Sequence, residues 1–159
     1  MLRPLADDDA ELVRDFTTER WGAPVAVAGG RIHQLDQLPG FGVFEDGGLR
    51  GLATYLIEGD ACELVSIDAV EEGHGIGTEL LEAVCAVAAG AGCDRLHLIT
   101  TNDNLRALRF YQRRGFRLIE VRPGAIAKSR ALKPSIPEVG FHGIALRDEL
   151  VLERNLRGA

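Results

Sequence analysis

The glycine-rich stretch Glu72-Gly73-His74-Gly75-Ile76-Gly77-Thr78 stands where the hydrophobic period of the chain changes. Before it, residues 63–70 have the alternation of a strand. After it, the spacing of apolar residues predicts one face of a helix that ends near Gly90 or Gly92. Three glycines at steps of two allow the backbone to curl, so that successive N–H groups point into one space. A strand, a glycine loop and a helix in this order favour a fold in which helices pack on a sheet.

The rest of the pattern predicts an α/β fold with a mixed sheet. A helix is predicted over about residues 8–20, an irregular connection over 21–40, and strands over 41–45 and 49–58 joined by an Asp46-Gly47-Gly48 turn. After the central helix we expect a strand at 96–99, a helix at 105–111, a strand at 116–121, a loop with a short helix at 123–133, and a long strand at 144–156. Meandering antiparallel strands are thus followed by a β-α-β-α-β run, and we expect residues 1–159 to form one domain.

The charge of the chain is unevenly distributed. The formal net charge is −6 and the pI is about 5.2, which argues against nucleic acid as a partner. Residues 1–94 carry 5 basic and 18 acidic side chains, whereas residues 95–133 carry 10 basic and 2 acidic ones. This asymmetry indicates either one cationic and one anionic partner, or two oppositely charged surfaces without a function.

Several classes of protein are disfavoured by what the sequence lacks. No apolar run is long enough to span a bilayer, so no membrane partner is expected. Cys62, Cys85 and Cys93 form no Cys-x-x-Cys pair, and an odd, sparse set of cysteines favours the reducing cytoplasm over a disulfide framework. The four histidines are scattered without metal-ligand spacing, so we expect no metal site.

The glycine loop predicts an anion site, because a helix N-terminus adds unpaired N–H groups and the positive end of its dipole. A plain glycine-rich turn is the alternative. The dinucleotide fingerprint fails, since Thr78 and Leu80 stand where it needs a third glycine, and the Walker pattern fails, since no lysine follows Gly77. The phosphate ligand is therefore not predicted by either standard nucleotide motif.

Two separate motifs lie on either side of the strand predicted at 96–99. They are Gly73-x-Gly75-Ile76-Gly77-x-x-Leu80-Leu81 and Asn104-x-x-Ala107-x-x-Phe110-Tyr111-x-x-x-Gly115-Phe116. The first resembles the acetyl-CoA pyrophosphate loop of the GNAT superfamily of N-acetyltransferases, and the second is similar to the second signature of that superfamily. Glu72 replaces the usual Gln or Arg of the loop, so we expect it to point away or to pair with an arginine. The resemblance covers about residues 1–121 and includes Leu2-Arg3-Pro4-Leu5 before the first helix.

The resemblance implies acetyl-CoA as cosubstrate and a set of residues that bind it. The loop would hold the pyrophosphate, and the backbone of the preceding strand would pair with the pantetheine arm where the sheet splays apart. Asn104 would hydrogen-bond the pantetheine or, alternatively, cap a helix, and arginines near it would meet the 3′-phosphate. The expected binding residues are Ser66, Ile67, Asp68, Gly73, His74, Gly75, Ile76, Gly77, Thr78, Asn104 and Arg109.

The resemblance also implies direct transfer of an acetyl group to a primary amine. Tyr111 is the candidate acid for the departing thiolate, with core packing as its alternative role. Glu63 is the first candidate for the base, with a solvent-facing strand end as its alternative, His33 is a lesser candidate, and a water chain could replace a side chain. For His97 we expect a structural role.

The acceptor is predicted from charge alone. The acidic first half would attract a small cationic amine, and Trp21 and the connection that follows could line its site. The unusually long stretch 122–143 could set specificity or form a homodimer contact. The alternative function is that of a non-catalytic acyl-CoA-binding regulatory module.

Overall fold

The computed structural model describes residues 1–157, which form a seven-stranded mixed sheet in the order β1-β4-β5-β6-β7-β9-β8. Its strands are β1 (Leu2–Pro4), β4 (Gly40–Glu45), β5 (Gly48–Glu58), β6 (Ala61–Ala69), β7 (Arg95–Thr101), β8 (Arg117–Arg122) and β9 (Glu149–Asn155). Neighbouring strands are antiparallel except β6 and β7, which are parallel. The predicted mixed α/β fold is confirmed.

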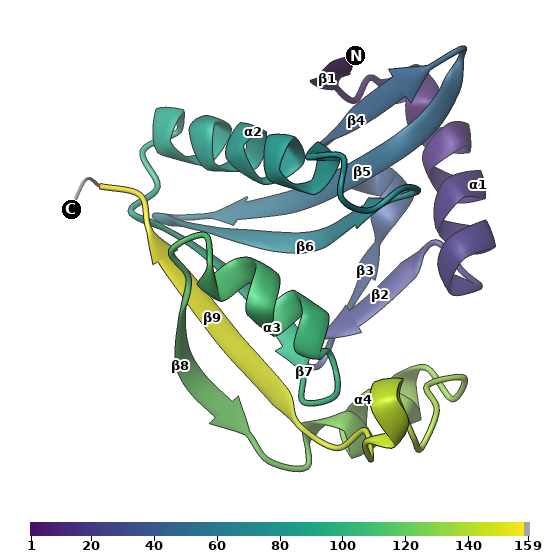
Figure 1. The fold of residues 1–159 in the computed structure, drawn as a ribbon, viewed down its shortest axis with the longest axis vertical. Helices are drawn as coiled ribbons and strands as arrows, with labels where there is room; N and C mark the ends of the chain where they lie inside the picture. Colours follow the sequence, from purple (N-terminus) through teal and green to yellow (C-terminus); the bar gives the residue numbers. More distant parts are fainter. Residues whose placement is uncertain (158–159) are drawn as a thin grey trace.

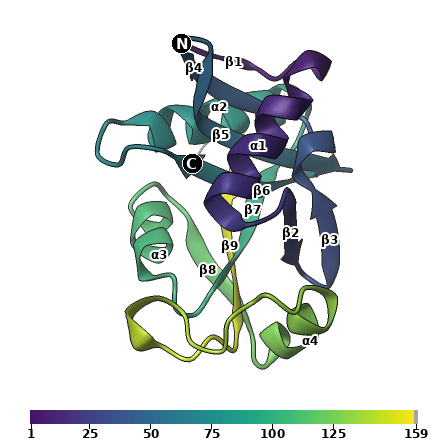
Figure 2. The same cartoon turned by 90° about the vertical axis from the view of Figure 1, so that its right-hand side faces the viewer.

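Helices α2 (Ile76–Gly90) and α3 (Leu105–Gln112) cover one face of this sheet. Helix α1 (Ala10–Trp21) and the two-stranded sheet of β2 (Val25–Ala28) and β3 (Arg31–Gln34) lie on the other face, as the two perpendicular views show (Figures 1 and 2). Helix α4 (Ala125–Leu132) lies at the end of the molecule where β7 and β9 meet their loops (Figure 1).

The main core lies between the sheet and helix α2. Leu80, Leu81 and Val84 of α2 are fully buried and pack against Leu96 and Leu152 of the sheet. A smaller cluster on the other face joins Val13 and Phe16 of α1 to Leu49 and Leu52 of β5. Because the helical and strand periods both present apolar residues to these two layers, burial of apolar surface holds the helices on the sheet.

The prediction of an irregular connection over 21–40 was wrong. The segment contains the β2–β3 hairpin, in which Ala28 pairs with Arg31 across Gly29 and Gly30, and a short 3₁₀ helix at Leu35–Gln37. Both glycines have positive φ, 61° and 76°, which a two-residue hairpin turn requires. The Gly-Gly pair after the apolar run Val25–Ala28 was the available sequence signal.

The final strand is shorter than predicted. It begins at Glu149 rather than at 144, because the side chain of Asn102 binds the backbone of the preceding residues. Its Oδ1 accepts the N–H groups of Arg147 and Asp148, both at 3.0 Å, and its Nδ2 donates to the carbonyl of Ala145 at 2.8 Å. These groups are therefore not available to a sheet ladder. The N-terminal strand β1 was also not predicted.

Among residues 1–157, no helix combines the length and the apolar character needed to cross a bilayer.

We expect Leu81→Ala to lower the free energy of unfolding by about 2–5 kcal/mol, because it leaves a cavity in a fully buried site. Leu118→Ala is the matched control. Leu118 lies on the edge strand β8 with 46% of its surface exposed, and its loss should cost about 0.5 kcal/mol or less. Urea unfolding monitored by circular dichroism measures both, and equal losses would contradict this assignment of the core.

Candidate active site

The strands β6 and β7 part from one another half-way along their length. They pair only from Ala61 to Leu64 on β6 and from Arg95 to Leu98 on β7. Beyond these residues β6 stays paired with β5, and β7 stays paired with β9. One edge of β6 from Val65 onward therefore carries backbone N–H and C=O groups that no neighbouring strand of the sheet satisfies.

A cleft of about 1170 Å³ occupies the space between the diverging strands. Residues Val65–Ala69 of β6 and Leu98–Thr100 of β7 line it. The start of α2 and one side of α3 form its walls, and the β2–β3 hairpin contributes Val25 and Ala26. The cleft therefore contains the unpaired edge of β6, which can pair with an extended ligand as a strand would.

The glycine loop meets this cleft at the N-terminus of α2. Gly75 is the N-cap residue, and Gly73 and Gly75 have φ of 79° and 77°, which side chains other than glycine rarely adopt. A Cβ at Gly77 would lie 3.3 Å from the ring of Phe110, so the first turn of α2 is close to α3. The first N–H groups of α2 have no partner inside the helix and are available to an anion.

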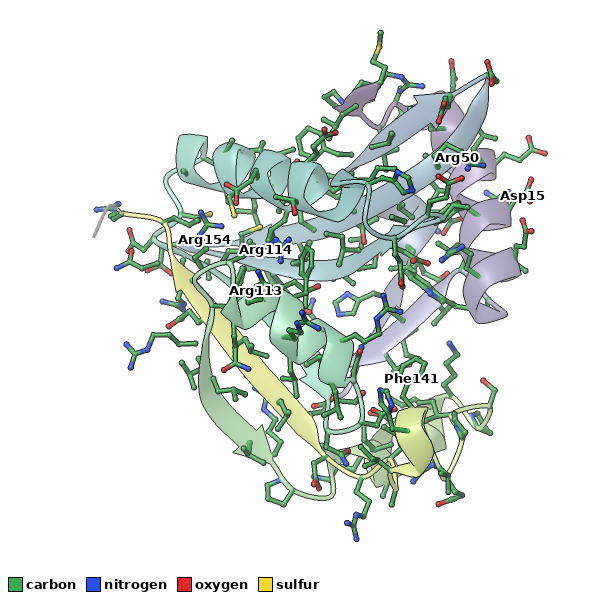
Figure 3. The ribbon with its side chains drawn as sticks, viewed as in Figure 1. Asp15, Arg50, Arg113, Arg114, Phe141 and Arg154 are labelled. Atoms are coloured by element: carbon green, nitrogen blue, oxygen red, sulfur yellow. The ribbon has the colours of Figure 1, made fainter. Side chains whose placement is uncertain are left out.

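Arginines of α3 surround the same end of the cleft. Arg106 pairs with Glu72, which answers the expectation that this carboxylate points away or pairs with an arginine. Arg114 donates to the hydroxyl of Thr78 at 3.0 Å and stacks on Phe110 at 3.8 Å. Arg109 lines the cleft without a carboxylate partner among the described residues. Figure 3 shows Arg113 and Arg114 at the C-terminal end of α3.

Not every predicted binding residue reaches the cleft. Ser66 and Asp68 line the cleft, but their side chains already have partners: the carboxylate of Asp68 pairs with Arg20, and the hydroxyl of Ser66 bonds to that of Thr54 at 2.6 Å. His74 lies outside the lining residues, 3.6 Å from Glu71. Asn104 lines the cleft, and its Oδ1 caps α3 by accepting the N–H of Ala107 at 3.2 Å.

Tyr111 lies on α3 between the cleft and the core. Only 6% of its surface is exposed, and its ring packs edge-on against Phe110 and Phe116. It also lines the cleft. Burial raises the pKa of Tyr111 above its ordinary value, so its hydroxyl carries a proton throughout the neutral range.

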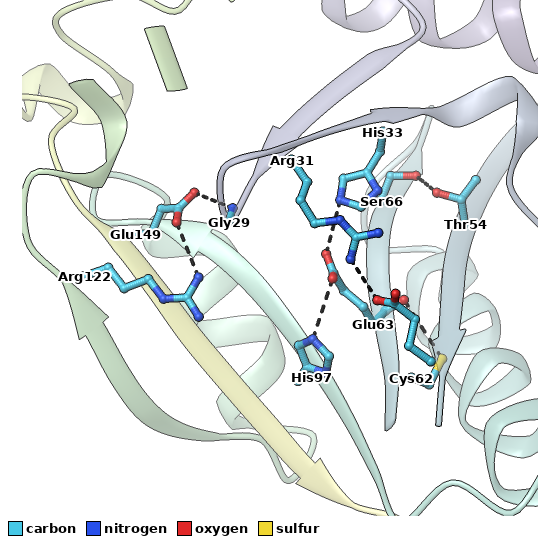
Figure 4. Close-up of polar contacts among 11 residues, drawn as sticks. Gly29, Arg31, His33, Thr54, Cys62, Glu63, Ser66, His97, Arg122 and Glu149 are labelled. Atoms are coloured by element: carbon cyan, nitrogen blue, oxygen red, sulfur yellow. Dashed lines mark hydrogen bonds and ion pairs between the residues drawn. The ribbon is translucent and has the colours of Figure 1, made fainter. Parts of the chain in front are cut away.

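Glu63 occupies a buried polar cluster beneath the β2–β3 hairpin rather than the cleft lining (Figure 4). Its carboxylate oxygens lie 3.7 Å from Nε2 of His33 and 3.6 Å from Nε2 of His97. Burial opposes ionisation of Glu63. Contact with His97 and attraction to His33, His97 and Arg31 outweigh that penalty and hold the pKa of Glu63 below its ordinary value. The solvent-facing alternative for Glu63 is wrong, because only 8% of its surface is exposed.

The segment 122–143, for which the sequence offered either a specificity role or a dimer contact, forms the far wall of the cleft. Lys133, Phe141 and His142 all line it, and Nζ of Lys133 donates to the carbonyl of Val25 at 3.2 Å. The buried carboxylate of Asp103 accepts the N–H of Phe141 at 2.9 Å. The turn that carries Phe141 and His142 is thereby fixed to the loop before α3 (Figure 3).

Glycine is required in that turn for space. A Cβ at Gly140 would lie 1.9 Å from Oδ2 of Asp103, so no other residue fits without a shift of the turn. No period or motif marks these residues in the sequence, because they approach the cleft only after the long segment folds back.

A model of the acetyltransferase (GNAT) family matches residues 9–116. The chain belongs to this family. The GNAT match includes the glycine loop, both diverging strands and α3. It ends before the segment 122–143, so the far wall of the cleft lies outside the part that the family model describes.

The chain also has two relatives that it matches over nearly their whole length. The chain is 44% identical over 144 residues to the uncharacterized protein YdhI of Bacillus subtilis (strain 168), covering 90% of each chain. It is 41% identical over 155 residues to the uncharacterized protein YxbD of the same organism, covering 97% of this chain and 98% of YxbD.

Solved structures share the GNAT fold. An IAA acetyltransferase from Bacillus cereus ATCC 14579 superposes with a TM-score of 0.72 at 22% identity over 98% of each chain. A GNAT family acetyltransferase from Elizabethkingia anophelis with acetyl-CoA bound has a TM-score of 0.69 at 21% identity, over 98% of this chain and 97% of that one. At these identities the likeness establishes the fold.

Proposed function

We propose that the protein is an N-acetyltransferase that moves the acetyl group of acetyl-CoA directly to a primary amine. The observation that carries this proposal is the meeting of the unpaired β6 edge and the glycine loop in one cleft. Membership of the GNAT family and the acetyl-CoA bound to the Elizabethkingia anophelis protein support it.

The residues around the cleft fit acetyl-CoA along its length. The N–H groups of Gly75, Ile76, Gly77 and Thr78 would bind the pyrophosphate, and Arg109 would meet the 3′-phosphate. The free backbone edge at Ser66, Ile67 and Asp68 would pair with the amides of pantetheine. Asn104 keeps its amide N–H groups for the pantetheine while its Oδ1 caps α3, so the two roles predicted for it are compatible.

The acid for the reaction is Tyr111 in this proposal. Acetyl-CoA supplies an activated thioester, and a backbone N–H near Ser66 and Ile67 would polarise its carbonyl. A phenol is protonated at neutral pH and Tyr111 lines the cleft, so it can donate a proton to the departing thiolate.

Glu63 is the base in this proposal and acts through water. Its carboxylate is charged at neutral pH, since the pKa is held low, and it lies beneath the hairpin residues that line the cleft. A proton leaving the amine would pass along water to Glu63 and its histidine neighbours. His97, whose side chain is 28% exposed, then connects the cluster to solvent, a role beyond the structural one expected for it.

The remaining predictions concern acceptor, assembly and compartment. The cationic acceptor stays a prediction, and no carboxylate lining the cleft supports it, because each is paired with a cation. The homodimer also stays a prediction. Cys62, Cys85 and Cys93 are buried free thiols, which supports the proposal of a reducing, cytoplasmic setting.

The alternative is an acyl-CoA-binding regulatory module without turnover. Release of free thiol from acetyl-CoA upon addition of amines separates the two. Binding of acetyl-CoA by calorimetry, with no thiol released on a broad amine panel, would favour the regulatory module.

Gly75→Glu should weaken acetyl-CoA binding by about 100-fold or more, because it strains a positive φ and places a carboxylate at the pyrophosphate. Gly90→Glu makes the same change at the other, exposed end of α2, where a Cβ meets nothing within 4 Å, and should leave affinity unchanged. Isothermal calorimetry measures both, and equal affinity in the Gly75 variant would remove the loop from the site.

Tyr111→Phe should lower kcat by about 100-fold, the usual contribution of a general acid, with little change in acetyl-CoA affinity. Tyr55→Phe serves as the control, since Tyr55 is also partly buried but does not line the cleft. Turnover is measured by thiol release with the best amine of the panel. An unchanged kcat would leave Tyr111 with core packing as its only role.

Glu63→Gln should lower kcat by about 10- to 100-fold and flatten the acidic limb of the pH–rate profile, because an amide cannot accept the proton. The wild-type limb should fall only in acid, since the pKa of Glu63 lies below its ordinary value. Glu58→Gln removes a nearby exposed carboxylate that pairs with Arg31 and should leave the profile unchanged. If the pH–rate profiles of the wild type and of the Glu63 variant coincide, Glu63 is not the base, and water alone deprotonates the amine.

A further inference from the structure

The charge inside the cleft is opposite to the charge of the chain. Six arginine and lysine side chains line it against three carboxylates, a net charge of +3 with histidine neutral, whereas the chain carries −6. The acidic residues of the first helix do not reach the cleft. Asp15, for example, points outward from α1 (Figure 3). The charge that an acceptor meets is therefore set by the lining residues.

Each carboxylate that lines the cleft is already neutralised by a neighbour. Asp68 pairs with Arg20, Glu71 lies 2.9 Å from Arg50, and Glu72 pairs with Arg106. Within the described residues, no lining carboxylate is left for the ammonium or guanidinium tail of a substrate. A second cationic group on the acceptor would thus enter a positive cleft without a partner.

Within residues 1–157, the lining cations without a carboxylate partner fall into two groups. Arg109, Arg113 and Arg114 belong to α3 and the residues that follow it, on the side assigned to the phosphates of CoA. Lys133 stands apart, on the far wall formed by the segment 122–143. Its ammonium donates one hydrogen bond, to the carbonyl of Val25, and has two N–H groups left.

Two exposed aromatic residues line the same cleft as Lys133 and suit the apolar part of an acceptor that Lys133 binds. Phe141, 62% exposed, and Trp21, 37% exposed, also line the cleft. Exposed aromatic rings of this kind bind an apolar chain, or the ammonium end of the same molecule through its π-face.

From these observations we propose that the acceptor is an amine whose non-reacting end is anionic, a carboxylate or a phosphate bound by Lys133, with its apolar part against Phe141 and Trp21. This inference rests on the proposed acetyl transfer and names the class of its second substrate. It replaces the cationic acceptor that the charge of the sequence predicted.

The test uses sets of amines matched in chain length. Each set contains an ω-amino carboxylate, an ω-aminoalkylphosphonate, the neutral-tailed alkylamine and the diamine, and phenylalanine is compared with phenethylamine. Thiol release from acetyl-CoA gives kcat/KM for each. We expect kcat/KM for at least one anionic-tailed amine to exceed that for its matched alkylamine by about tenfold or more, because a charge-assisted hydrogen bond to Lys133 is gained. The diamine should have the lowest kcat/KM of its set, because its second ammonium group is repelled by the positive cleft. The preferred member distinguishes carboxylate from phosphate.

Variants of Lys133 test whether its positive charge causes the preference for anionic-tailed amines. Lys133→Met should abolish the preference by raising KM for the anionic-tailed amine about tenfold more than KM for the neutral-tailed alkylamine. Lys133→Arg should retain it. Lys128→Met removes the only other lysine of the chain, which is exposed on α4 and does not line the cleft, and should have no effect. Equal increases in KM for the two amines would indicate that Lys133 acts only by holding the far wall through its bond to Val25, and would reject its charge as the cause of the preference.

Three results would overturn the inference. Preference for diamines or alkylamines, with thiol released, rejects the anionic acceptor and leaves acetyl transfer standing. A preference for anionic tails that survives in Lys133→Met rejects Lys133 as its cause. Release of thiol with none of the amines, while calorimetry shows acetyl-CoA bound, rejects the proposed function and this inference with it.

Discussion

The parting of β6 and β7 is the constraint on which the rest of the site depends. Each strand keeps its outer partner, β5 for β6 and β9 for β7, so the sheet stays continuous up to Leu64 and Leu98 while two inner edges open. Unpaired backbone groups are costly when buried, and a ligand with amides of its own can satisfy them. The same separation leaves room for α2 and α3 to bring the glycine loop and Tyr111 to one cleft.

Elements with a strong local period were predictable from the sequence, whereas those set by distant contacts were not. Helix α2 and the strands before it follow from the spacing of apolar residues and from the turn at Asp46 and Gly47. The strand predicted from 144 failed, because the side chain of Asn102, remote in sequence, binds that backbone. The β2–β3 hairpin was missed although Gly29 and Gly30 marked its turn, since mixed polarity hid the strands.

The residues of the site show the same difference between local sequence patterns and distant contacts. The two motifs predicted the loop and the helix that carries Tyr111, because each motif is contiguous in the sequence. The pairing of Glu72 with Arg106 spans 34 residues, and the position of Glu63 between His33 and His97 depends on three strands. The charge of a sequence segment was likewise a poor guide to the cleft, since most acidic side chains of the first half face away or are paired.

The far wall explains how one fold can keep its donor chemistry while its acceptor changes. The segment 122–143 lies outside the match to the GNAT family, yet Lys133, Phe141 and His142 line the cleft. Among its contacts with the rest of the chain, Lys133 donates to the hairpin carbonyl of Val25, and the N–H of Phe141 donates to Asp103. Neither contact involves the glycine loop or the β6 edge. Because the two halves of the cleft are built from separate segments, substitutions in the far wall can alter acceptor recognition without disturbing the residues proposed to hold acetyl-CoA.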